Sequence, residues 1–104
     1  MATDARELSR ESRQGLVESR LDESFFRVRV DRVTVQELKY LRAMAEVPDE
    51  AKRSGDVAAI LGRSSPSLAP TRARLVQKGL LYTAGHGFSA FTVPQFGEFL
   101  RRSY

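Results

Sequence analysis

Residues 55–82 read GDVAAILGRSSPSLAPTRARLVQKGLLY, and the small and turn-forming residues within them indicate the fold. Gly62 follows a short apolar run and can supply the left-handed residue that ends a helix. Ser64 can cap a second helix, which we expect to run to about Lys78 and to be closed by Gly79. The stretch therefore predicts two helices joined by a tight turn.

Ser54 is the expected N-cap of the first of these helices, over residues 55–61. Small side chains at Ala58 and Ala59 allow the two helices to pack closely. The residues expected to face the core are Val57, Ile60, Leu61, Leu68, Leu75 and Val76. Pro70 lies beyond the first turn of the second helix, so we expect a bend or a looser first turn there.

The segment before this pair contains two further signals. Residues 25–31 alternate with period two, which places Phe26, Val28 and Val30 on one face and predicts a short strand or extended segment. Thr34 and Glu37 have the spacing of a capping box, so a helix should begin there. Its expected buried face is Val35, Leu38, Leu41 and Ala45, and a loop follows from Pro48.

The segment after the pair predicts a hairpin and a closing helix. Two β-prone runs, 80–84 and 88–93, are joined by Gly-His-Gly at 85–87, where glycine permits the positive φ of a tight turn. Pro94 can occupy the first position of the closing helix. The phenylalanines expected in the core are Phe25, Phe26, Phe91, Phe96 and Phe99.

The resulting order is helix, short helix, tight turn, longer helix and hairpin. This order is the signature of a winged helix-turn-helix, an α+β fold, mainly helical, with a three-helix core and a β-hairpin wing. We place this domain at residues 25–104. Residues 1–24 are expected to form an N-terminal helical extension, the end of a preceding domain.

Composition excludes several kinds of chemistry. The chain has 104 residues, no cysteine and one histidine, so thiol nucleophiles, disulfides and histidine-rich metal sites are not expected. No nucleophile and base can be assigned, so we expect no enzymatic activity, cofactor or small-molecule substrate. No apolar run could span a bilayer and no signal region begins the chain, so we expect a soluble cytoplasmic protein without membrane contact.

Positive charge gathers in the second part of the chain. The net charge is +4, but residues 1–62 hold 11 Lys/Arg against 12 Asp/Glu, while residues 63–104 hold 6 against 1. Residues 63–78 contain no acid at all. This distribution favours a polyanionic partner, and duplex DNA fits the predicted fold.

The expected DNA contacts follow from this charge. Four cations would neutralise phosphates, the serines at the helix start would bind phosphate or approach the groove, and the loop histidine would touch DNA at the wing tip. The candidate residues are Arg63, Ser64, Ser65, Ser67, Thr71, Arg72, Arg74, Lys78 and His86. The same residues could instead be a solvated face, helix caps and an ordinary turn residue. Side chains suited to bidentate base reading are absent, so we expect recognition of the DNA backbone or shape.

Three runs of the sequence resemble a known domain. FFRVRVDRVTVQELKYLRAMAE, SGDVAAILGRSSPSLAPTRARLVQKGLLY and FTVPQFGEFLRR are similar to the C-terminal winged-helix domain of bacterial AAA-type ATPases, a group related to the initiator and STAND-like ATPases. The resemblance covers about residues 21–102. It implies DNA contact through residues 65–78 and 83–88, and an upstream nucleotide-binding module with residues 1–20 as the end of its lid region. This chain has no G-x-x-x-x-G-K-[ST] loop.

Two alternatives to DNA binding stay open. The domain could be a protein-interaction or autoregulatory module that docks on the ATPase domain of the same parent chain or on another partner. It could also be a free-standing regulator that dimerises through its N-terminal helix.

Overall fold

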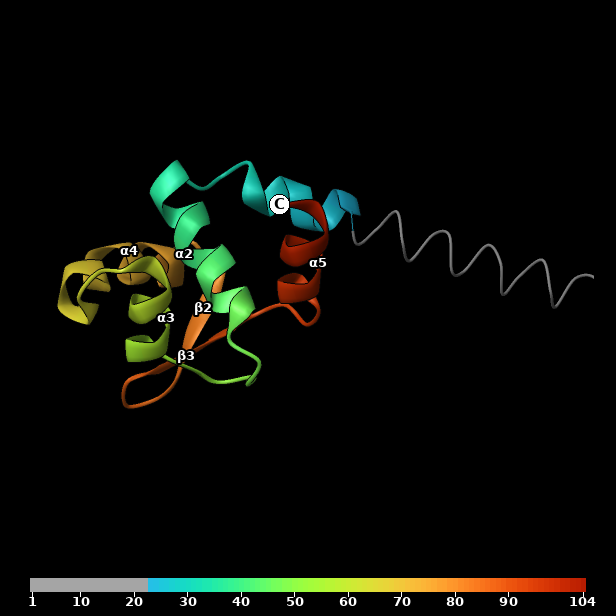
Figure 1. Cartoon of the computed structure of the whole chain (residues 1–104). Coiled ribbons are helices and arrows are strands. Elements are labelled where there is room, and N and C mark those ends of the chain that lie inside the picture. Colours follow the sequence, from blue (N-terminus) through green and yellow to red (C-terminus); the bar gives the residue numbers. More distant parts are fainter. Residues whose placement is uncertain (1–22) are drawn as a thin grey trace, which may run out of the picture.

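Five helices and three short strands make up residues 23–104, the part of the chain that the computed structural model describes (Figure 1). The fold is α+β and mainly helical. A helix covers residues 23–30, and the remaining elements are α2 (Val35–Glu46), β1 (Lys52–Arg53), α3 (Ser54–Leu61), α4 (Ser65–Gln77), β2 (Leu81–Gly85), β3 (Phe88–Phe91) and α5 (Phe96–Ser103). The predicted extension over residues 1–24 lies almost wholly outside the described residues.

The three strands form one antiparallel sheet in the order β1-β3-β2. Leu81 pairs with Phe91 in the hairpin of β2 and β3, and the ladder is irregular between Thr83 and Gly85. Gly85 and Gly87 both have positive φ, which the loop between these strands requires. The predicted hairpin is therefore confirmed. Strand β1 was not predicted, because its two residues are too few to show an alternation of apolar and polar side chains.

Helix α2 lies at the centre of the domain and packs against α3, α4 and α5. The predicted capping box is present, because the Thr34 amide donates to Glu37 Oε1 at 3.0 Å and the Glu37 amide donates to Thr34 Oγ1 at 3.1 Å. Val35 was expected on the buried face, but it is 70% exposed. The buried residue of this first turn is instead Glu37, because the side chains of Arg74 and Lys78 cover its carboxylate.

The pair of helices α3 and α4 is joined as predicted. Gly62 has φ 66°, and the amide of Arg63 donates to the Ala58 carbonyl, which closes α3. The Ser64 hydroxyl accepts a hydrogen bond from the Ser67 amide at 3.3 Å, so Ser64 caps α4.

Three details of this pair correct the expectations. The N-cap of α3 is Arg53, and Ser54 is the first residue inside the helix. Ile60 is 49% exposed, because at about 100° per residue it falls outside the arc occupied by the buried Val57 and Ala58. Val76 near the end of α4 is also exposed, at 38%.

The strand predicted over residues 25–31 is wrong, because residues 23–30 form a helix. Phe26 and Val30 are buried, whereas Val28 is 54% exposed. Positions four apart share a face in a helix as well as in a strand, so the alternation did not distinguish the two structures. The Phe26 ring lies 4.9 Å from the Phe99 ring, centroid to centroid, and this packing selects the helix.

Aromatic side chains join the two ends of the described region. The rings of Phe26, Phe96 and Phe99 pack together and are buried, which confirms these three as core residues. Phe25 was also expected there, but it lies largely on the surface, and Phe91 is partly buried. The closing helix begins at Phe96 rather than at Pro94, because Gln95 adopts φ 69° just before it.

Within residues 23–104, no helix has both the length and the apolar character needed to cross a membrane.

Candidate nucleic-acid interface

The basic side chains of α4 are directed towards α2. Arg72 Nε donates to the Tyr40 hydroxyl at 3.0 Å, and one of its terminal nitrogens lies 3.4 Å from the Ser65 carbonyl oxygen. Tyr40 is almost fully buried, so Arg72 satisfies a hydroxyl that reaches out from the core. Arg72 is therefore engaged within the domain.

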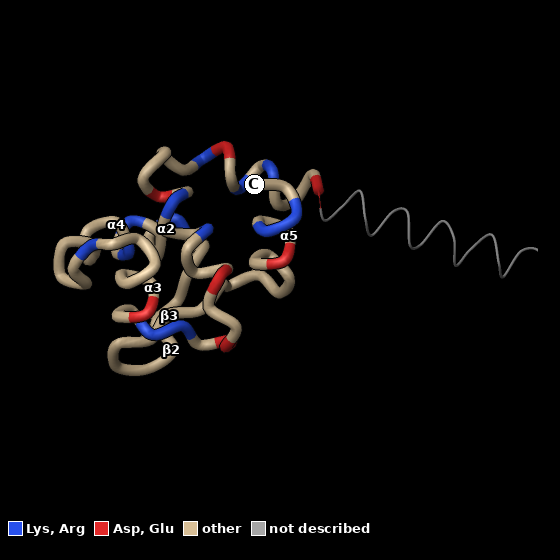
Figure 2. Tube along the Cα trace, in the orientation of Figure 1, with Lys and Arg blue, Asp and Glu red and all other residues tan. Residues whose placement is uncertain are grey.

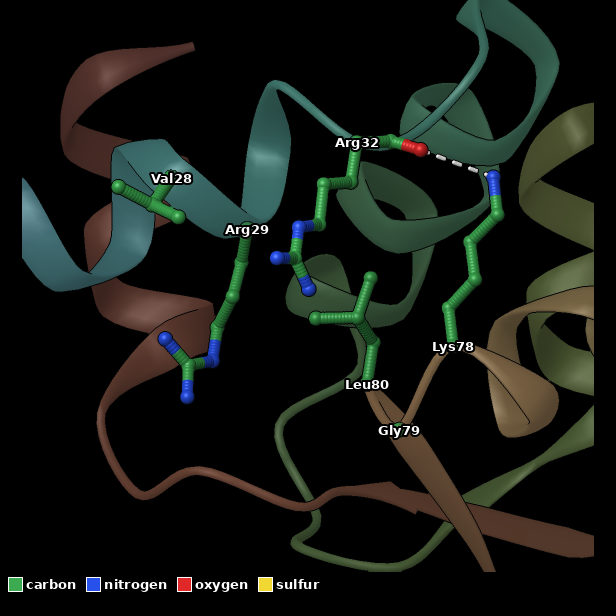
Figure 3. Close-up of a pocket in the computed structure, with 6 residues that line it drawn as sticks. All are labelled: Val28, Arg29, Arg32, Lys78, Gly79 and Leu80. Atoms are coloured by element: carbon green, nitrogen blue, oxygen red, sulfur yellow. Dashed lines mark hydrogen bonds between the residues drawn. The ribbon is translucent and has the colours of Figure 1, made fainter.

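Arg74 and Lys78 share a single carboxylate. Arg74 Nε lies 3.2 Å from Glu37 Oε2, and Lys78 Nζ lies 2.6 Å from Glu37 Oε1. The Glu37 side chain has no exposed surface, while about half of the Arg74 side chain and a third of that of Lys78 remain accessible. Lys78 Nζ also donates to the Arg32 carbonyl at 2.9 Å, drawn as a dashed line in Figure 3.

These contacts determine the ionisation of Glu37. Burial by itself raises the pKa of this carboxyl, but the hydrogen bonds from Lys78 and from the Thr34 amide, with the charges of Lys78 and the contact from Arg74, outweigh it. The pKa of Glu37 is consequently below its ordinary value. Glu37 is therefore an ionised group that holds two cations of α4 in place.

Residues 63–78 contain no acid, but this does not mean that their cations lack acidic partners, because Arg74 and Lys78 pair with Glu37. The balancing acid comes from α2, 37 positions before Arg74 and 41 before Lys78. Sequence reasoning identified Glu37 only as a helix cap. One signal was available, because a capping box needs only one carboxylate oxygen and leaves the second without an assigned donor.

The outward face of α4 carries no charge along most of its length. Pro66, Ala69, Pro70 and Ala73 are all exposed and lie on one side of the helix. Thr71 was expected to approach a DNA groove, but its side chain is buried and lies 3.3 Å from Arg74. Thr71 therefore faces inwards and is not available to a DNA groove.

The N-terminal end of α4 differs from the rest of the helix. Arg63 is exposed and has no ion-pair or hydrogen-bond partner for its side chain among residues 23–104. Ser64 and Ser67 hydrogen-bond to each other, with Ser67 Oγ donating to the Ser64 carbonyl at 2.7 Å, and Ser65 is half-buried. The serines mainly cap the helix, which leaves Arg63 as the free cation of this turn.

The loop between β2 and β3 presents His86 to solvent. In Figure 1 this loop and the turn between α3 and α4 both lie on the side of the domain away from α5. Arg63 and His86 are both exposed, and that they form two parts of one interface stays a prediction.

Sequence reasoning missed two cations of α2. Lys39 and Arg42 are exposed and have no ion pair with any described residue. Lys39 and Arg63 line the same hollow of about 140 Å³ between α2 and the start of α4. A second hollow, of about 240 Å³, adjoins Lys39, Arg42, the exposed Ile60 and one acid, Glu46. We call Lys39, Arg42 and Arg63 the unpaired basic cluster.

Basic residues elsewhere are spread over several elements. Figure 2 shows lysine and arginine positions on α2, α4, α5 and the β1 segment. Arg53 of β1 pairs with Asp56 at 2.9 Å, and Arg101 of α5 donates to the Ala45 carbonyl. In the described part of the chain, no group of three or more potential ligand side chains could hold a metal ion.

Comparison with known proteins gives one result. A search of curated proteins found no match. A search of solved structures likewise found none. A family model described as a domain of unknown function, DUF8462, matches residues 23–100, which is most of the chain and nearly all of the described region. The chain therefore belongs to the DUF8462 family.

Proposed function

We propose that the domain is a winged helix-turn-helix that binds duplex DNA mainly through phosphates. The order of α2, β1, α3, α4 and the β2–β3 hairpin supports this proposal, as does the tight turn at Gly62. In this interpretation α4 is the recognition helix and the β2–β3 hairpin is the wing. The resemblance to C-terminal domains of AAA-type ATPases is in agreement.

The observation that carries the proposal is the unpaired basic cluster. Lys39, Arg42 and Arg63 are exposed, and none has a carboxylate partner among residues 23–104. Lys39 and Arg63 lie beside the start of α4, the part of a recognition helix that enters the major groove, and Arg42 follows Lys39 on α2. When such unpaired cations neutralise DNA phosphates, the counterions condensed on the DNA are released. This release drives non-specific binding.

The uncharged outward face of α4 supports recognition without sharp sequence preference. Pro66, Ala69, Pro70 and Ala73 have no side-chain donor or acceptor that could pair with a base edge. Specific base contacts would have to come from the few polar groups at the helix start. We therefore propose that phosphate contacts and DNA shape account for most of the affinity.

The proposal is tested by fluorescence anisotropy of the chain with a labelled mixed-sequence duplex over a series of salt concentrations. Arg63→Ala and Lys39→Ala should each weaken binding about threefold or more at low salt and lower the salt slope by about 1. Arg27→Ala is the matched control, because Arg27 is exposed on the helix over residues 23–30 and outside the cluster. Absence of binding at low salt, or equal losses in all three variants, would overturn the proposal.

Arg72, Arg74 and Lys78 are poor choices for this test. Their substitution would also remove contacts to Tyr40 and Glu37, so a loss of DNA binding could not be separated from a loss of fold. Any contact of these residues with DNA would use the side-chain N–H groups that are not already donated to Tyr40 and Glu37.

A second candidate function is docking on a protein, and the outward face of α4 favours it. A helix face of proline and alanine suits an apolar contact better than a phosphate backbone. The ATPase domain implied by the resemblance is the first partner to test. Ala73→Arg separates the two functions, because the added charge should strengthen DNA binding at low salt and disrupt docking. Docking is rejected if the chain does not bind the ATPase domain.

A further inference from the structure

A separate basic hollow lies just past the other end of α4, between residues 78–80 and residues 28–32. Its volume is about 270 Å³. The residues that line it are Val28, Arg29, Arg32, Lys78, Gly79 and Leu80 (Figure 3). Three of these side chains are cationic and none is acidic.

Arg29 is held in place on one wall of the hollow. One terminal nitrogen of Arg29 donates to the Phe25 carbonyl at 2.9 Å, and the guanidinium carbon lies 3.4 Å from the centre of the Phe25 ring. Cation–π stacking and one hydrogen bond occupy one face and one donor of the guanidinium. A guanidinium has five N–H donors, so most of its hydrogen-bonding capacity stays available.

Arg32 lies between Arg29 and Lys78 in Figure 3, and its guanidinium extends towards Leu80. Its side chain has no hydrogen-bond or ion-pair partner among residues 23–104. Lys78 has a structural role in the hollow. Its Nζ donates hydrogen bonds to the Arg32 carbonyl and to Glu37, and the first of these holds the backbone of Arg32 in place. The fold thus brings a free guanidinium beside a stacked one.

The remaining walls are apolar. Val28 is one of the more exposed aliphatic side chains of the described region, and Leu80 closes the floor beside Gly79. Together Val28 and Leu80 give the hollow an apolar side, against which the apolar part of a ligand could pack.

We propose that this hollow binds a small organic anion, a carboxylate or phosphate carried on a compact apolar body. The anionic group would lie between Arg29 and Arg32, whose planar forks match the oxygens of either group. The apolar body would lie against Val28 and Leu80. The site is independent of the unpaired basic cluster, so it can exist whether or not the domain binds DNA.

Heteronuclear NMR of the chain labelled with nitrogen-15 tests this site with three probes: phenyl phosphate, inorganic phosphate and neutral benzyl alcohol. Phenyl phosphate should give saturable shifts at the side-chain N–H groups of Arg29 and Arg32 and at the amides of Gly79 and Leu80. Inorganic phosphate should bind there at least threefold more weakly, and benzyl alcohol should leave these signals unchanged.

Variants of the exposed side chains complete the test. Arg29→Gln combined with Arg32→Gln should weaken phenyl phosphate binding at least tenfold, whereas Arg27→Gln on the same helix should leave it unchanged. Val28→Asp places an acid in the wall of the hollow without touching the core, and it should abolish binding even if the double variant is poorly folded.

Three outcomes would overturn the proposal. Shifts of equal size at Arg63 and Arg102 would indicate general attraction of anions to arginine. Persistence of binding in both Val28→Asp and the double variant would place the anion elsewhere. Duplex DNA that shifts the same signals and displaces phenyl phosphate would make the hollow a contact for the DNA backbone.

Discussion

Lys78 at the end of α4 donates a hydrogen bond of 2.6 Å to the carboxylate of Glu37 near the start of α2, although 41 positions separate the two residues. Glu37 also accepts hydrogen bonds from the Thr34 amide and from Arg74. One buried carboxylate thus caps α2 and attaches α4 to it. The cations of α4 that the charge pattern assigned to DNA contribute first to the stability of the domain.

Replacing this carboxylate should destabilise the protein. Glu37→Gln keeps the size of the side chain, but its amide group presents a donor to Lys78 or Arg74, which are themselves donors. Because both cations are partly exposed and can be solvated, we expect the free energy of unfolding to fall by about 1–3 kcal/mol. Urea denaturation followed by circular dichroism measures this change. Glu46→Gln, exposed on the same helix, should stay within about 0.5 kcal/mol, and equal losses in the two variants would contradict the role given to Glu37.

Stability should fall at acidic pH partly through Glu37. Its pKa in the folded protein is below the ordinary value of 4.5, so the unfolded chain binds more protons than the folded one in this range. The contribution of Glu37 is therefore present above pH 4.5 and is lost as the pH falls through the lowered pKa. Urea titrations from pH 7 to pH 2.5 should show a smaller acid loss for Glu37→Gln than for the unchanged chain. The pKa of Asp56 is also lowered, by its hydrogen bond from Arg53, so Asp56→Asn is measured in parallel. Identical pH curves for the chain and Glu37→Gln would refute the assignment.

Two valines distinguish the helix over residues 23–30 from the predicted strand. Val30 is buried and Val28 is exposed. Val30→Ala should lower the free energy of unfolding by about 1–3 kcal/mol, and Val28→Ala should change it by less than about 0.5 kcal/mol. Both valines would face the same side of a strand, so similar losses for the two variants would favour the strand. Chemical denaturation of the two single variants decides between the structures.

Removing the internal proline of α4 should stabilise the protein. Pro70 lies inside α4, where it cannot donate to the preceding turn, and its side chain is exposed. Pro70→Ala should raise the free energy of unfolding by about 1–3 kcal/mol, as measured by thermal and urea denaturation. Pro66→Ala is the control, because proline is tolerated in a first turn and its replacement should have little effect. A loss of stability in Pro70→Ala would mean that the proline ring makes a packing contact worth more than the missing hydrogen bond.

Local features of the fold could be predicted from the sequence because their partners lie within a few positions. Thr34 and Glu37 are three residues apart, and so are Ser64 and Ser67, so each cap is formed by neighbours. Gly62 needs only its own backbone conformation to end α3. The hairpin around residues 85–87 is equally local.

Burial within single elements was harder to predict. Val35, Ile60 and Phe25 are apolar residues that the sequence pattern placed inwards and that the structure exposes. A pattern gives the face of a helix, but the neighbouring elements decide how much of that face they cover. Val35 and Ile60 lie on arcs of α2 and α3 that the neighbouring elements leave uncovered, although Glu37 in the same first turn of α2 is buried.

The candidate interface divides in the same way. The order of the helices and the hairpin from α2 onward, the caps at Thr34 and Ser64, and the gathering of positive charge after residue 62 could be predicted from the sequence. The helix over residues 23–30, strand β1 and the N-cap of α3 at Arg53 could not. Only the tertiary structure decided which of those charges are free, because Tyr40 and Glu37 reach Arg72, Arg74 and Lys78 across 32 to 41 positions. The contact of a long side chain with a distant helix depends on packing geometry, which no local pattern records.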